Sequence, residues 1–251
     1  MNTKNLLATG LASMAMAFSA LATNYPGNGA AGFGSPVGSG SLDVTDTANS
    51  LTFTFNRGAG AMNDDLVVYL DTQLGGFSDT LLFSDNADGG RTAVSGFNGG
   101  NPSRSLVTFA AGFTADYALS IENGFIGVFG LAPGGNNSLN FLFGLGQSGN
   151  NLAASYSITL TAAQMSQIGL TAGSGQTFSL VGSLTSTSAY RSNETIGNSL
   201  TVPSDGAGNA GFNNPQVFTQ SDVFTLTTVP EPTTLALAAS GLAMLLIRRR
   251  R

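Results

Sequence analysis

Two short stretches decide the class of fold, Leu51-Thr52-Phe53-Thr54-Phe55 and Asp65-Leu66-Val67-Val68-Tyr69-Leu70-Asp71. In the first, apolar and polar residues alternate strictly, which is the pattern of a strand with one buried face. The second is a continuous apolar run between two aspartates, which is typical of a strand buried on both faces. Together they predict a β-sheet protein.

Similar apolar stretches recur along the chain, and turn residues separate them. They cover residues 80–83, 105–109, 117–121, 125–129, 139–143, 154–160, 177–181 and 223–227. Between them stand glycine-rich turns such as Gly75-Gly76 and Pro133-Gly134-Gly135. Many short strands joined by such turns predict an all-β fold, an antiparallel β-sandwich or jelly roll. The polar stretch 188–214 is expected to be either a long surface loop or a poorly ordered excursion.

One short helix is expected within this fold, over residues 161–168. Thr161 can cap its first turn while Gln164 reaches back to the cap, which is the capping-box pattern. Gly169 is suited to the position just after the helix. We expect about two turns crossing one end of the sandwich.

Composition excludes several classes of function. The chain has 251 residues and a net charge of −5, and it contains no Cys, no His and no Trp. Without these residues it forms no disulfide, no zinc–thiolate site and no Ser-His-Asp triad. Outside the two ends the basic residues are only Arg57, Arg91, Arg104 and Arg191. A phosphate-binding surface needs clustered Lys and Arg, so we expect no nucleic-acid partner. We also expect no catalysis.

The N-terminus has the pattern of a signal peptide. Lys4 precedes an apolar run over residues 6–21, and Ala20-Leu21-Ala22 forms a small-x-small cleavage site. Residues 1–22 are therefore predicted to form a signal helix, which signal peptidase removes after Ala22 during Sec export. Residues 23–40 are rich in Gly, Pro and Asn and are predicted to form a flexible leader, followed by a β-sandwich domain over residues 41–228.

The C-terminus, residues 229–251, has three parts in order. Pro230, Glu231 and Pro232 come first, an uncharged apolar stretch spans residues 233–247, and Arg248, Arg249, Arg250 and Arg251 end the chain. The apolar stretch is about 22 Å long as a helix, short for a membrane span. The arginines cannot cross a bilayer cheaply, so they stay in the cytoplasm. This pattern predicts a short transmembrane helix with the domain outside the inner membrane.

This tail resembles the PEP-CTERM sorting signal of Gram-negative bacteria. The resemblance implies that an exosortase, a membrane Cys protease similar to a transpeptidase, recognises Pro230-Glu231-Pro232 and cuts nearby. The protein would be anchored transiently in the inner membrane and then released or attached at the cell surface. The family is associated with exopolysaccharide and biofilm matrix. The alternative is a generic tail anchor.

A cluster of aspartates lies between residues 63 and 88. Oxygen-rich turns can hold Ca²⁺, and Ser84 to Gly89 partly fits the start of a calcium loop, with Asp85, Asn86 and Asp88 as candidate ligands. However, Ser95 occupies the twelfth position, where a bidentate Glu is needed. The alternative is that these residues form Asx turns by bonding their own backbone. We expect no other cofactor.

A second, fainter resemblance concerns sugars. Residues 64–76 and 113–119, which include Asp116-Tyr117, look similar to sandwich domains that bind carbohydrate. The missing Trp departs from their sugar platform. We therefore expect a non-catalytic component of the exopolysaccharide matrix. One alternative is a polysaccharide-binding module with structural calcium; another is a glycan-active enzyme that uses two carboxylates.

Overall fold

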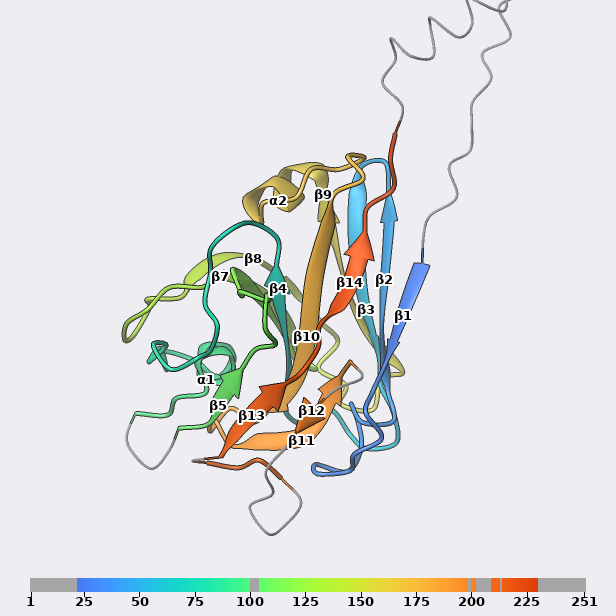
Figure 1. The fold of residues 1–251 in the computed structure, drawn as a ribbon. Helices are drawn as coiled ribbons and strands as arrows, with labels where there is room; N and C mark the ends of the chain where they lie inside the picture. Colours follow the sequence, from blue (N-terminus) through green and yellow to red (C-terminus); the bar gives the residue numbers. More distant parts are fainter. Residues whose placement is uncertain (1–21, 100–103, 198–199, 202–208, 213, 230–251) are drawn as a thin grey trace, which may run out of the picture.

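The computed structural model describes residues 22–99, 104–197, 200–201, 209–212 and 214–229, which form two packed β-sheets and a partial third layer (Figure 1). The prediction of a mainly antiparallel all-β fold is confirmed. The predicted signal helix, up to residue 21, and the predicted C-terminal helix lie outside the described residues. Within the described part, no helix is long and apolar enough to span a membrane.

The first sheet contains β1 (Ala22–Pro26), β2 (Ser41–Thr47), β3 (Ser50–Asn56) and β9 (Ser155–Thr161), in the order β1-β2-β3-β9. Leu51, Phe53 and Phe55 of β3 are fully buried, as the alternation predicted. The intervening Thr52 and Thr54 face outward, and their hydroxyls bond to hydroxyls of β9 at 2.9 and 3.0 Å. One face of this sheet therefore packs on the core and the other carries a polar ladder.

The second sheet has seven strands. It comprises β11 (Arg191–Ile196), β10 (Thr177–Thr185), β4 (Asp65–Asp71), β6 (Tyr117–Ile121), β7 (Phe125–Gly130) and β8 (Asn140–Gly146) in that order, and β14 (Asp222–Thr225) also pairs with β10. Central β4 is buried on both faces, as predicted. Leu66, Val68 and Leu70 point into the core between the sheets, while Val67 and Tyr69 belong to a second hydrophobic cluster on the outer face.

A third layer covers part of this outer face. It consists of α1 (Gly89–Ser95) and a small sheet of β12 (Leu200–Thr201), β13 (Pro215–Phe218) and β5 (Leu106–Thr108). Val94 and Phe218 of this layer, with Phe83 and Phe109 of the adjoining loops, belong to one hydrophobic cluster with Tyr69 of the sheet. The cover leaves the outer face of β7 and β8 partly open, and this open area positions the candidate site.

The structure contains two described helices where one was predicted. The expected helix is α2 (Ala162–Gln167), with the capping box of Thr161 and Gln164 in place, and Gly169 follows with a φ of +75°. The unpredicted helix is α1, which begins with two glycines that are poor helix formers. Burial of its residues 92–95 on the sheet outweighs that weak local preference.

Residues 23–40 differ from the predicted flexible leader, because they are part of the fold. β1 pairs with β2 along its whole length. The loop after β1 wraps around Glu194 of β11, whose side chain is fully buried. Its Oε1 accepts the backbone N–H groups of Phe33 and Ser35 at 2.7 and 3.0 Å, and its Oε2 accepts those of Val37 and Gly38 at 2.9 Å each. One carboxylate thus orders a segment rich in glycine.

Two other stretches also differ from expectation. Residues 80–83 form turns with isolated bridges instead of a strand, and the guanidinium of Arg104 holds them by donating to the carbonyls of Leu81 and Phe83 at 3.1 and 2.8 Å. Within 188–214, residues 191–196 form β11 instead of a surface loop. Residues 80–83 are a short stretch, and residues 188–214 are a polar one. The structure of each depends on contacts with residues far away in the sequence.

Candidate functional site

A groove of about 380 Å³ opens on the outer face of the second sheet beside α1. We call it the α1 groove. It is lined by Asp88, Gly89, Gly90 and Arg91 at the start of α1, by Ser120 and Glu122 of β6 and the turn after it, and by Phe125, Gly127, Phe129 and Phe141 of β7 and β8. One side is therefore aromatic and the other is charged.

The aromatic side rests on a pair of facing glycines. Phe125, Gly127 and Phe129 alternate along β7 and point to the same face, and Gly127 lies opposite Gly144 of β8. A Cβ atom on Gly144 would lie 2.2 Å from Cζ of the Phe125 ring, so the ring occupies the space that a side chain at this position would need. Phe125 and Phe141 are 37% and 44% exposed, with ring centroids 6.2 Å apart. The groove thus presents two exposed phenyl rings side by side.

The charged side contains carboxyl groups with raised pKa values. Burial raises the pKa of Glu122, and the negative charge of Asp88 raises it further. Behind Ser120 lies Asp65, which is 1% exposed and accepts the Ser120 hydroxyl at 3.2 Å. Burial, helped by the charge of Glu122, raises the pKa of Asp65 to about 8. At neutral pH Asp65 is therefore mostly protonated, while Glu122 and Asp88 supply the acceptors of the groove.

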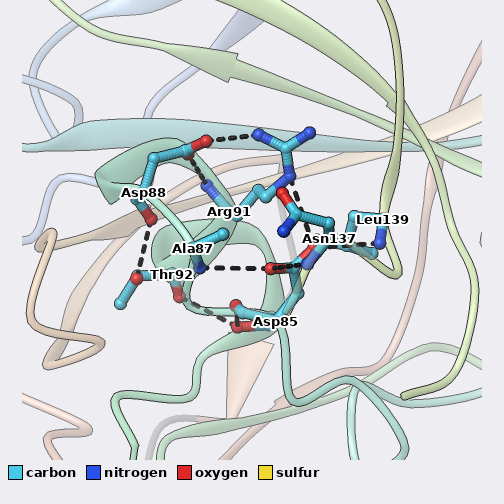
Figure 2. Close-up of polar contacts among 8 residues, drawn as sticks. Asp85, Ala87, Asp88, Arg91, Thr92, Asn137 and Leu139 are labelled. Atoms are coloured by element: carbon cyan, nitrogen blue, oxygen red, sulfur yellow. Dashed lines mark hydrogen bonds and ion pairs between the residues drawn. The ribbon is translucent and has the colours of Figure 1, made fainter. Parts of the chain in front are cut away.

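Asp85 and Asp88, two of the calcium candidates, are occupied by N–H groups (Figure 2). Asp85 Oδ1 accepts the backbone N–H groups of Ala87 and Asn137 at 3.1 and 2.9 Å, and its Oδ2 accepts that of Leu139 at 3.0 Å. Asp88 caps α1 by accepting the backbone N–H of Arg91 at 2.9 Å. The bond from Ala87 is an Asx turn, the alternative that the sequence left open.

The third calcium candidate, Asn86, lies near Gly99: a Cβ atom on that glycine would be 3.1 Å from its Nδ2. Over the part of the chain that the structure describes, no group of three or more acidic side chains is arranged to hold a metal ion. The loop from Asp85 to Asp88 is therefore built mainly from carboxylate–amide bonds.

Arg91 connects this loop to the groove. Its Nε lies 3.3 Å from Asp85 Oδ2, and its Nη1 pairs with the Asp88 carboxylate (Figure 2). Its guanidinium carbon also lies 5.3 Å from the centre of the Phe129 ring. These contacts fix a cation at the wall of the groove. The groove therefore offers apolar ring faces, carboxylate acceptors and guanidinium donors, which suit a hydroxylated ring ligand.

The acid–aromatic pair Asp116-Tyr117, named from the sequence, lies elsewhere, and so does Tyr69 of β4. Asp116 and Tyr117 line a second cleft near α2, of about 390 Å³. Asp116 Oδ2 accepts the backbone N–H groups of Thr72 and Gln73 at 3.0 and 3.1 Å, so it holds the turn after β4. Tyr69 is fully buried and donates to the Val94 carbonyl at 2.7 Å. Of these three residues, Asp116 and Tyr117 line a cleft and Tyr69 does not.

Apart from Asp88, which was a calcium candidate, sequence reasoning did not single out the residues of the α1 groove. The usable signal was the pattern Phe125-x-Gly127-x-Phe129, in which a glycine interrupts the outward face of a strand. A glycine in a strand often marks a place where another group approaches the backbone closely. Here that group is the ring of a neighbouring phenylalanine.

The described chain ends at Val229, beside the sorting tail. The backbone N–H of Thr227 donates to Asp46 Oδ2 at 2.6 Å, and its hydroxyl donates to Asp46 Oδ1 at 2.8 Å. The backbone N–H of Val229 donates to the Gly173 carbonyl at 2.9 Å. Ala22 is the first residue of β1. Ala20, the Pro230-Glu231-Pro232 motif and the four terminal arginines lie outside the described residues.

The comparisons identify this tail. Residues 228–251 match the PEP-CTERM protein-sorting motif, which confirms the resemblance noted above. The chain thus ends in a PEP-CTERM sorting motif, which supports export and targeting to an exosortase. No curated protein and no solved structure matches the chain. The fainter resemblance to carbohydrate-binding sandwich domains stays a prediction.

Proposed function

We propose that this exported protein acts outside the inner membrane as a non-catalytic component of the exopolysaccharide matrix, after an exosortase has processed its tail. The observation that carries the proposal is the sorting motif at residues 228–251. Signal peptidase and the Sec machinery are its partners before processing. The mature domain then stands at the cell surface or is released.

The roles of the buried acids support a structural domain. Asp46, Asp85, Asp116 and Glu194 each accept backbone N–H groups, and each fixes a loop or a chain end. Carboxylates used in this way stabilise the fold instead of serving a reaction, because their oxygens are already engaged. A domain with few charges and rigid loops suits a matrix protein.

Processing can be tested in cells that contain an exosortase. Wild-type protein should appear as a shortened form outside the inner membrane. Glu231→Ala in the recognition motif should accumulate as the full-length form in the membrane fraction, while the exposed Leu152→Ala should behave as wild type. A Glu231→Ala variant that is shortened and released normally contradicts the proposal.

A second candidate function, polysaccharide binding, is favoured by the α1 groove. Phe125 and Phe141 offer exposed ring faces to the C–H face of a sugar, and Glu122 and Asp88 offer acceptors for its hydroxyls. Two carboxylates, Asp88 and Glu122, against the one guanidinium of Arg91 leave the groove lining with a net negative charge, which disfavours an acidic polysaccharide. The ligand proposed is therefore an uncharged polysaccharide.

Affinity electrophoresis through gels that contain neutral or acidic polysaccharide tests this second function. A neutral polymer should retard the wild-type domain, and Phe125→Ala with Phe141→Ala should abolish the retardation. Leu152→Ala removes an even more exposed apolar side chain outside the groove, at 61%, and serves as the control. Repeating the run with EDTA tests whether calcium takes part. Equal mobility of all variants in every gel contradicts the proposal.

A further inference from the structure

The sandwich fixes the start of the sorting motif. Three groups hold residues 226–229: the Asp46 carboxylate, the Gly173 carbonyl and the Gln176 carbonyl, which accepts the Leu226 N–H at 2.9 Å. We call these three residues the exit clamp. Asp46 is 1% exposed, so its two bonds to Thr227 are shielded from water.

The glycine-rich loop between α2 and β10, which contributes Gly173 and Gln176 to the exit clamp, makes further close contacts with the chain end. Ser174 forms a β-bridge with Thr228. A Cβ atom on Gly173 would lie 3.0 Å from the Val229 side chain, and one on Gly175 would lie 2.6 Å from the Thr228 hydroxyl. The loop therefore approaches the chain end more closely than most residue types allow.

The matched motif begins at residue 228, so its first two residues are already part of the fold. Pro230 follows Val229 directly, and no spacer separates the clamped strand from Pro230-Glu231-Pro232. A membrane enzyme that cuts near this motif binds its substrate as an extended chain. Residues whose N–H groups are bonded to the domain are not available in that form.

We propose that the exit clamp controls processing of the tail, with Asp46 as a positioning residue that withholds the first residues of the motif until the clamp opens. The inference rests on the proposed processing by an exosortase. When opening and closing are fast, the rate of cutting follows the population of the open state. A weaker clamp therefore raises the processing rate, although it weakens the fold.

Pulse–chase labelling of the full chain in exosortase-containing cells tests this inference. Asp46→Asn keeps the shape of the side chain and removes one of its two acceptor oxygens. We expect conversion to the shortened form to become roughly tenfold faster, which is the effect of losing one such hydrogen bond. Thr227→Val removes only the hydroxyl donor and should give a smaller rise, and it stands in if Asp46→Asn fails to fold.

A flexible spacer before the motif distinguishes a specific effect of the exit clamp from a general loss of stability. Inserting Gly-Ser-Gly-Ser between Val229 and Pro230 should speed processing as well, and adding Asp46→Asn to the spacer chain should change nothing further. Asp79→Asn makes the same chemical change at a carboxylate that accepts the Leu81 N–H at 2.9 Å within its own turn, away from the exit clamp, and should leave the rate unchanged. Hydrogen exchange at the Thr227 and Val229 amides reports opening directly.

Several results overturn the inference. One is an Asp46→Asn variant that is processed at the wild-type rate although its Thr227 amide exchanges faster. Another is an equal acceleration by Asp79→Asn, and a third is an Asp46→Asn effect that persists in the spacer chain. Normal processing of Glu231→Ala, by contrast, overturns the proposed function itself. The two failures are therefore distinguishable.

Discussion

Replacing Glu194 by Gln should release the segment between β1 and β2. The two oxygens of Glu194 accept four backbone N–H groups at 2.7 to 3.0 Å. Gln keeps one acceptor oxygen and turns an NH₂ group toward two of these donors. Two charge-assisted bonds are lost, each worth about 1.5–3 kcal/mol, so unfolding should become easier by about 3–6 kcal/mol. That is a large part of the ~5–15 kcal/mol that stabilises a typical domain.

Urea denaturation and amide hydrogen exchange measure this effect. The midpoint of unfolding should fall, and the amides of Phe33, Ser35, Val37 and Gly38 should exchange faster than those of β3. Glu122→Gln is the matched control, since it makes the same change at a side chain for which the structure records no hydrogen bond to a backbone N–H. If Glu194→Gln and Glu122→Gln unfold at the same urea concentration with equal protection of these amides, the reasoning is refuted.

Three further predictions concern pH, packing and the chain start. The pKa of Asp65 is about 8 in the fold, above its unfolded value of about 3.9. Its contribution to the free energy of unfolding is therefore complete below about pH 4. As the pH rises from about 4 to about 8, that contribution declines by about 1.4 kcal/mol per pH unit. Asp65→Asn should flatten that decline in urea titrations from pH 5 to 9, and an unchanged slope would show that Asp65 is ionised. Gly144→Ala should push the Phe125 ring away from the sheet and lower the free energy of unfolding by about 1–3 kcal/mol. Gly146→Ala is the control and should lower it far less, because a Cβ atom at Gly146 has no atom within 4 Å. Equal melting temperatures of the two variants would contradict this. The mature protein should begin at Thr23 by mass spectrometry, and a form that still begins at Met1 would rule out signal cleavage.

Much of the fold could be predicted where burial leaves a pattern in one stretch of sequence. The apolar run of β4 and the alternation of β3 gave strands with bounds close to those observed, and Thr161 and Gln164 gave the capping box of α2. β2 and β11 gave no such signal. Their inward positions include Asp46 and Glu194, which look like surface residues until their backbone partners are known.

The α1 groove could not be predicted for a related reason. Its aromatic side depends on Gly127 of β7 facing Gly144 of β8, and that pairing is a matter of strand register, not of composition. The charged side depends on α1, which the sequence did not predict because two glycines, poor helix formers, stand at its start. The sorting tail, by contrast, consists of consecutive residues and needs no tertiary partner to be recognised.

The fold joins residues from opposite ends of the chain, and this has a consequence for the order of folding. The Tyr25 hydroxyl donates to the Val223 carbonyl at 2.8 Å across 198 residues, and Asp46 meets Thr227 across 181 residues. Such distant pairs form slowly, because a long loop must close first. During vectorial export the N-terminal strands emerge long before Val223 does. Their pairing with the C-terminal strands is therefore expected to be a late step of folding, on the far side of the membrane.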